Sequence, residues 1–270
     1  MSASETAGLA LAGWAAMAAA MALAFWARRA TGNSGWIDAV WTLSTGFTGA
    51  ALALAGSGAW PRKGIVALCA FLWAVRLGLH IVKRTLKIDD DPRYRALETE
   101  WGDRAAARLF LFLQAQAFVG AVLALAVALA ALAAASNLRD GVALLVFAVA
   151  FVGEALADRQ LAAFKADAAN KGRICDVGLW DLSRHPNYFF EWLAWVSAAL
   201  AAMPTNASGL PGSLALAAPA AMYWTLRFAS GVPPLEAHMA ATRGAAFERY
   251  KARTPEFFPR LVQAKREATP

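Results

Sequence analysis

Charged residues are scarce in this chain of 270 residues, where Asp, Glu, Lys and Arg together make up 17% of the sequence. A typical soluble domain contains about 25% charged residues. Hydrophobic residues account for 59%, and they occur in long blocks that do not alternate with polar residues. The low charge argues against a soluble globular domain, and the lack of alternation argues against a transmembrane β-barrel.

Cysteine and histidine are also rare. The two cysteines, Cys69 and Cys175, fall in an apolar block and in a polar connection, so we expect no disulfide between them. The three histidines, His80, His185 and His238, lie far apart, so we expect no zinc site. Neither a GxGxxG nor a GxxxxGK[ST] motif is present, which excludes Rossmann and P-loop nucleotide binding. Any nucleotide must therefore be held by helix ends and loops.

The apolar blocks are long enough to cross a membrane. A spanning helix needs roughly 20 apolar residues, and lipid offers no water to an unpaired backbone group, so we expect helices. We predict an all-α polytopic protein with seven transmembrane helices, an ordered cap of cytoplasmic loops and a single membrane domain over residues 1–270. The predicted spans are 7–27, 36–57, 64–82, 109–135, 140–157, 188–204 and 212–229.

The basic residues follow the predicted topology. Nearly all of the 26 Lys and Arg residues lie in or beside the connections after the first, third, fifth and seventh spans. The positive-inside rule places these connections in the cytoplasm, with the N-terminus outside and the C-terminus cytoplasmic. Glu5 before the first span and Arg28 and Arg29 after it favour a spanning helix over a signal peptide. We expect a monomer in a bacterial inner membrane, with membrane lipid as a partner and no nucleic acid.

The strongest candidate site lies at the start of the sixth predicted span. Pro186 suits the first turn of a helix, and Arg184 and His185 beside it would lie where a helix N-terminus favours an anion. Asn187 and Glu191 are four residues apart, so they share a helix face. An acid about one turn into the membrane usually faces a partner or a cavity. The segment predicts a cofactor or substrate site; the alternative is an interfacial anchor with a buried structural pair.

Asp38 opens a polar face on the second predicted span. A desolvated carboxyl group can retain its proton and polarise a carbonyl. The alternative is an acid that stabilises the first turn of its helix. The sequence favours neither interpretation over the other.

The third predicted span carries two more candidates, and a charged connection follows it. His80 and Arg84 are four residues apart and share a helix face. Asp90, Arg93 and Tyr94 lie in the connection. These residues predict a contribution to a site; the alternative is a salt-bridged cytoplasmic surface.

Several of these segments together resemble the signature of bacterial members of the steroid 5-alpha-reductase family. Their order and spacing, from about residue 36 to residue 260, are more specific than any one of them alone. The segments are Ile37–Trp41, Trp73–Gly78, Asp90–Tyr94, Trp180–Trp192, Ser230–Glu236 and Phe247–Pro259.

The resemblance implies a seven-helix fold that binds NADPH from the cytoplasmic side. Hydride would pass to the β-carbon of an enone such as a 3-oxo-Δ4-steroid, so the substrate would be a hydrophobic small molecule. The resemblance carries a cofactor-binding role onto residues in the matching segments and near them. They are Arg84, Asp90, Arg93, Tyr94, Asp158, Arg173, Arg184, His185, Asn187, Tyr188, Glu191 and Tyr250.

The catalytic residues depart from the pattern of the animal members. In those proteins a Gln-Glu pair at the start of the second helix and a Tyr on the third helix bind the ketone. Asp38 lies near the acid position, whereas Ile81 stands where the Tyr would be. His80, the preceding residue, is the substitute candidate. We therefore expect Asp38 and His80 to be the catalytic residues.

Two other functions fit parts of the sequence. Membrane methyltransferases of the isoprenylcysteine and phospholipid type also carry an Arg-His-Pro-x-Tyr stretch followed by Glu, and they use S-adenosylmethionine. A transporter or a non-catalytic lipid-binding protein is a third reading, although transporters often contain internal repeats and none is evident here. Dependence on NADPH or on S-adenosylmethionine separates the first two functions.

Overall fold

The computed structural model describes residues 2–204 and 210–260, and within them the chain is helical, with no β-strand. Five helical segments in this part of the chain are long and apolar enough to cross a membrane. They are α1 (Ala3–Thr31), α2 (Gly35–Ala55), α3 (Trp60–Thr85), the segment Pro92–Leu132, and α6 (Asn137–Ala166). The all-α fold is therefore confirmed in the described residues, and the first five predicted spans correspond to helices that are long and apolar enough to cross a membrane.

The fourth of these segments is made of three helices. A short α4 (Pro92–Trp101) and a 3-10 turn, η1 (Gly102–Arg104), precede the long α5 (Ala105–Leu132). Gly102 has a positive φ of 53° and ends α4, a conformation that glycine adopts without strain. The connection that carries Tyr94 is thus largely helical.

The last two predicted spans have a different form. The sixth is α8 (Pro186–Ala202), which has 17 residues. The seventh is divided into α9 (Leu210–Ser213), η3 (Leu214–Leu216), α10 (Ala217–Trp224) and the π-helix η4 (Thr225–Ala229). The prediction of seven spans therefore remains a prediction.

The chain forms two compact units. The first contains Met1–Ala143 and Val196–Ala221, and the second contains Leu144–Trp195 and Met222–Pro270. The helices α6, α8 and α10 each contribute residues to both units. The single membrane domain over residues 1–270 remains a prediction.

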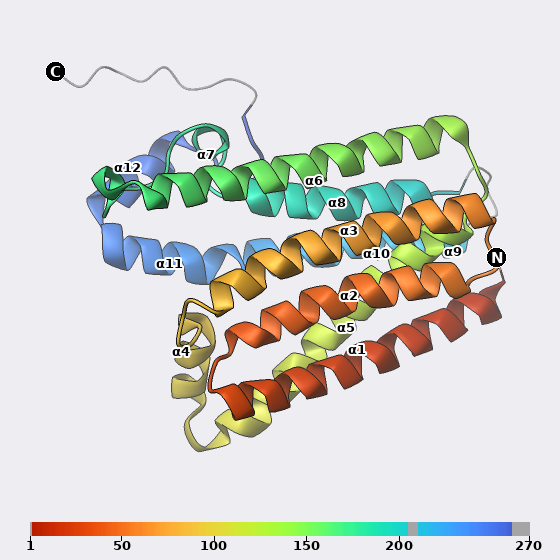
Figure 1. Ribbon diagram of the computed structural model, residues 1–270, viewed down its shortest axis with the longest axis horizontal. Helices are drawn as coiled ribbons and strands as arrows, with labels where there is room; N and C mark the ends of the chain where they lie inside the picture. Colours follow the sequence, from red (N-terminus) through yellow and green to blue (C-terminus); the bar gives the residue numbers. More distant parts are fainter. Residues whose placement is uncertain (1, 205–209, 261–270) are drawn as a thin grey trace. The chain divides into compact units, whose positions relative to one another are not determined.

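In the first unit, α1, α2, α3 and α5 form a bundle, and α4 lies at the end where α3 finishes and α2 begins (Figure 1). Small residues let the helices approach closely, as is typical of membrane helices. A Cβ atom on Gly46 of α2 would lie 2.3 Å from the Cβ atom of Ala74 on α3. One on Gly120 of α5 would lie 2.5 Å from Cε of Met17 on α1.

The other end of this unit is held by arginines that cap helix C-termini. Arg62 donates to the carbonyl oxygens of Ala130 (2.7 Å) and Ala201 (2.6 Å) and pairs with Asp140. Arg139 donates to the carbonyl of Met203 (2.6 Å). The last carbonyls of a helix lack partners within the helix, so these cations stabilise the ends of α5 and α8.

The second unit contains the later part of α6, the start of α8, and the short helices η2 (Ala168–Asn170), α7 (Leu179–Leu182), α11 (Val232–Arg243) and α12 (Ala245–Arg253). After α12, residues Thr254–Arg260 form a non-helical segment that we call the C-terminal strap. Arg184 N donates to the carbonyl of Pro255 (2.8 Å), and Arg260 N donates to that of Leu182 (3.0 Å). The strap is therefore tied by backbone hydrogen bonds to the residues just before α8.

Candidate functional site

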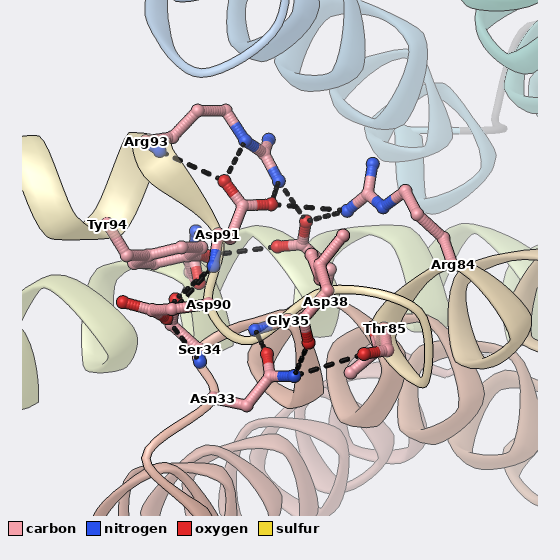
Figure 2. Close-up of polar contacts among 12 residues, drawn as sticks. Asn33, Ser34, Gly35, Asp38, Arg84, Thr85, Asp90, Asp91, Arg93 and Tyr94 are labelled. Carbon is pink, nitrogen blue, oxygen red and sulfur yellow. Dashed lines mark hydrogen bonds and ion pairs between the residues drawn. The ribbon is translucent and has the colours of Figure 1, made fainter.

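Many of the predicted site residues lie in polar clusters within the two units. Asp38, Arg84, Asp90, Arg93 and Tyr94 lie together in the first unit (Figure 2). The remaining cofactor-binding candidates lie in the second unit, as does the Arg-His-Pro-Asn segment.

The first cluster is built where the connection after α3 meets the start of α2. Asp90 accepts hydrogen bonds from the backbone N–H (2.9 Å) and the hydroxyl of Ser34, the residue before α2. The Asn33 amide donates to the carbonyls of Thr85 (3.0 Å) and Ile88 (2.7 Å). Asp91 caps α4 by accepting from Arg93 N at 3.0 Å. These bonds fix the position of the connection relative to α2.

Asp38 lies at the centre of this cluster and accepts from three donors (Figure 2). Arg93 forms an ion pair with it, Arg84 Nη2 lies 3.3 Å away, and the Tyr94 hydroxyl donates to it at 3.0 Å. Gln116 on α5 donates in turn to the Tyr94 oxygen at 3.3 Å. The contacts join α2, α3, α4 and α5. In this arrangement Asp38 acts as an acceptor, and the hydroxyl proton belongs to Tyr94.

Two neighbouring carboxylates complete the charge balance. Burial alone would raise the pKa of Asp91, but the hydrogen bonds and charge of Arg93 and the charge of Arg84 outweigh it and lower the pKa. Burial would also raise the pKa of Asp90, but hydrogen bonds from Ser34 and Arg95 outweigh it and lower the pKa. Both groups are therefore ionised at neutral pH and are matched by guanidinium groups.

His80 lies one helical turn before Arg84 on α3 and is exposed. Ile81, which replaces the expected Tyr, is only partly buried. Arg84 is itself 45% exposed at its side chain, whereas Arg93 is 30% exposed. Of the two arginines that contact Asp38, Arg84 is therefore the more accessible to a ligand.

The second cluster begins with buried carboxylates on α6 and α8. Glu154, Asp158 and Glu191 are all buried, with 4%, 8% and 6% of their surface exposed. Asn187 Nδ2 lies 3.4 Å from Asp158 Oδ1, and Trp195 Nε1 donates to Glu191 at 3.0 Å. Buried acids in apolar helices are costly and are typical of functional sites.

Arg184 and His185, just before α8, are buried and share one acid. Glu236 of α11 accepts from Arg184 Nε at 2.8 Å and lies 2.9 Å from His185 Nε2. Arg184 Nη1 also donates to the carbonyl of Thr254 in the strap at 2.7 Å. The His185 ring is stacked on Tyr188, with centroids 5.5 Å apart. Arg184 therefore joins the start of α8 to α11 and to the strap.

Glu236 is a central residue that the sequence analysis placed in a matching segment without giving it a role. Burial would raise its pKa, but hydrogen bonds from His185 and Arg184 and the charge of Arg184 lower the pKa to about 2. Its partners are 51 and 52 residues away in sequence. No local pattern could have linked an acid after two prolines to Arg184.

The two remaining candidates lie in different surroundings. Tyr250 is buried, and its hydroxyl donates to the carbonyl of Trp180, so it packs α12 against α7. Burial is the main cause that raises the pKa of Tyr250. Arg173 is exposed and donates to the Asn170 side chain at 3.2 Å. Tyr250 is thus used in packing, whereas Arg173 lies open to a charged ligand.

We predict that Asp38→Asn lowers the free energy of unfolding by about 1.5–3 kcal/mol, the usual contribution of hydrogen bonds to a charged group. The exchange removes the negative charge that Arg84 and Arg93 share, so α4 loses part of its attachment. Thermal or chemical unfolding of the detergent-purified chain measures the effect. Asp89→Asn, exposed in the same connection, is the matched control. Equal stability of the two variants would contradict the prediction.

We also predict that Glu236 makes stability depend on acid pH. Its pKa is lowered from an ordinary value of 4.5 to about 2, so its contribution is complete above pH 4.5 and is lost as the pH falls through 2. The stability difference between the wild-type chain and Glu236→Gln should therefore narrow progressively below pH 4.5. Unfolding measured across this range is the test, with the exposed Glu248→Gln as control. A difference that stays constant would show that the Glu236 pKa is not lowered.

No curated protein and no solved structure matches the chain. A family model matches residues 24–254, a range that includes both polar clusters. Because this match extends over most of the sequence, the chain belongs to the family described as a protein of unknown function, DUF1295.

Proposed function

We propose that the chain is a membrane-embedded NADPH-dependent reductase that transfers hydride to the C=C bond of an enone lipid. A 3-oxo-Δ4-steroid is the proposed substrate type. The sequence resemblance to bacterial steroid 5-alpha-reductases motivates the proposal. The observation that carries it is the buried carboxylates Asp158 of α6 and Glu191 of α8, with the partly buried Asn187 amide 3.4 Å from Asp158.

This group fits the polar parts of a nicotinamide nucleotide. A carboxamide and ribose hydroxyls need both donors and acceptors, which an Asn amide and two carboxylates supply. The phosphates need cations, and Lys165 in the last turn of α6 and Lys171 and Arg173 in the connection after it are exposed. A donor set of acids and amides beside a basic connection therefore supports NADPH as the cofactor.

The proposed reaction assigns separate tasks to the chain. NADPH, when bound, supplies the hydride for the β-carbon, and a proton must reach the α-carbon to complete the reduction. Asp38 and His80 are the proposed groups for the ketone and the proton. Because Asp38 accepts from Tyr94 and two arginines, a proton would reach the substrate more readily from Tyr94 or His80 than from Asp38. The protein would thus orient the enone and stabilise enolate charge.

The proposal includes a topology. We propose that α8 and the segment 212–229 complete seven spans, with the N-terminus outside and the C-terminus in the cytoplasm. The high share of Lys and Arg in alternate connections supports this orientation. We further propose a bacterial inner membrane and a monomer that takes its substrate from the lipid phase.

The alternative proposal is an S-adenosylmethionine-dependent methyltransferase. Buried carboxylates would also attract the sulfonium and amino groups of that cofactor. The exposed cations Lys171 and Arg173 favour NADPH, because S-adenosylmethionine has no phosphate to pair with them. The two proposals differ in the cofactor that binds.

We predict that the detergent-purified chain binds NADPH and that Asn187→Ala weakens binding about tenfold, or about 1.4 kcal/mol, for one lost hydrogen bond. Isothermal titration with NADPH and, separately, with S-adenosylmethionine is the measurement. Asn137→Ala is the matched control. It removes an exposed amide at the start of α6, whereas Asp158 lies towards the other end of that helix.

The outcomes of this titration separate the proposals. NADPH binding that weakens in Asn187→Ala and not in Asn137→Ala supports the reductase. Binding of S-adenosylmethionine in place of NADPH supports the methyltransferase. If neither cofactor binds a folded chain, both enzyme proposals fail.

A further inference from the structure

Three large aromatic side chains are exposed near the last helices of the second unit. Trp224, Phe228 and Phe258 are 60%, 55% and 52% exposed. Trp224 ends α10, Phe228 lies in the π-helix η4, and Phe258 lies in the C-terminal strap. A soluble surface rarely carries rings of this size together, so the feature calls for a partner that covers them.

Two of the exposed rings, Phe228 and Phe258, are the outer part of a larger aromatic cluster that includes Tyr223. The Phe258 ring lies 5.6 Å from that of Trp192 and 6.0 Å from that of Tyr223. Its neighbour Phe257 is 3% exposed and lies 5.1 Å from Tyr223. The strap thus inserts one ring among α8 and α10 and leaves the next ring on the surface.

A cation accompanies the exposed rings. The Arg227 guanidinium lies 5.0 Å above the Phe228 ring and pairs with Glu256 of the strap at 2.7 Å. Its side chain remains 32% exposed. Aromatic rings beside arginine are typical of the headgroup layer, where the rings face the acyl chains and the cation faces the phosphates.

We infer that Phe258, Phe228 and Trp224 lie in the headgroup layer of a phospholipid bilayer and anchor the C-terminal strap to it. The inference rests on the proposed topology, in which α8 enters the membrane. Trp192, which Phe258 contacts, is six residues after Pro186 and therefore about 9 Å along α8. A ring at that depth lies close to the boundary between headgroups and acyl chains.

The anchoring of the strap links the bilayer to the buried polar residues just before α8. In the strap, the carbonyl of Pro255 accepts a hydrogen bond from Arg184 N, and the carbonyl of Phe257 accepts one from the Ser183 hydroxyl. These are the residues that lead into α8. Lipid contact at Phe258 therefore holds the segment that positions His185.

The test places a nitroxide probe at Phe258→Cys in the full chain, in a Cys69→Ala and Cys175→Ala background, reconstituted in nanodiscs of phosphatidylcholine and phosphatidylglycerol. The control is Arg249→Cys, on the exposed side of α12. We expect the ratio of oxygen to nickel-chelate accessibility to be several-fold higher at 258 than at 249. Equal ratios would overturn the inference.

A second measurement keeps the native cysteines. Benzoylphenylalanine incorporated in place of Phe258 is irradiated in the same nanodiscs and compared with incorporation in place of Arg249. A phospholipid adduct formed mainly at 258 supports the inference. A cross-linked dimer would show that a second copy of the chain covers the patch. Equal adduct yields at the two positions would show that water covers it. Either outcome overturns the inference. Neither readout needs a cofactor, so failure of NADPH binding leaves this result interpretable.

Discussion

The structure depends on one constraint, which is that charged side chains placed against apolar helices must be matched by partners. An unpaired ion in a medium of low polarity costs several kcal/mol, so each acid or base near the helices must find an opposite charge or a hydrogen bond. In the first unit this requirement produces the group around Asp38, where Arg93 and Tyr94 are its closest partners (Figure 2). In the second unit it produces the contacts of Glu236 with Arg184 and His185. Each group fixes the loops of its own unit.

The same constraint distinguishes charged residues held by short contacts from charged residues that are more exposed. Arg184 is bonded to the strap, and Tyr250 is bonded to α7. Their contribution to a site would therefore be to position other groups. Arg173 is exposed, and Arg84 is held by longer contacts of 3.3 Å. Asp158, Asn187 and Glu191 lie on the helices themselves. The proposed cofactor would use the acids and the amide near α8 together with the exposed Arg173 of the same unit.

Much of the fold could be predicted from the sequence because apolar length and helical spacing are local properties. The first five spans and the helical spacing of Asn187 and Glu191 follow from them. The partners of Asp38 could not be predicted, since Arg93 and Tyr94 lie 55 and 56 residues away and meet it only after α3 and its connection have folded back. Glu236 and the strap escaped prediction for the same reason. The broken form of the last predicted span was missed because its composition is mostly apolar, while its backbone changes from 3-10 to α to π geometry.

The central claim is that the chain reduces an enone with hydride from NADPH. The most direct measurement uses NADPH deuterated at the hydride-donating carbon, with the chain in nanodiscs and a 3-oxo-Δ4-steroid as substrate. The account predicts a product, analysed by mass spectrometry, that carries deuterium at the former β-carbon and forms only in the presence of the chain. Transfer of a labelled methyl group from S-adenosylmethionine to lipid, without deuterium transfer to any enone, would contradict it.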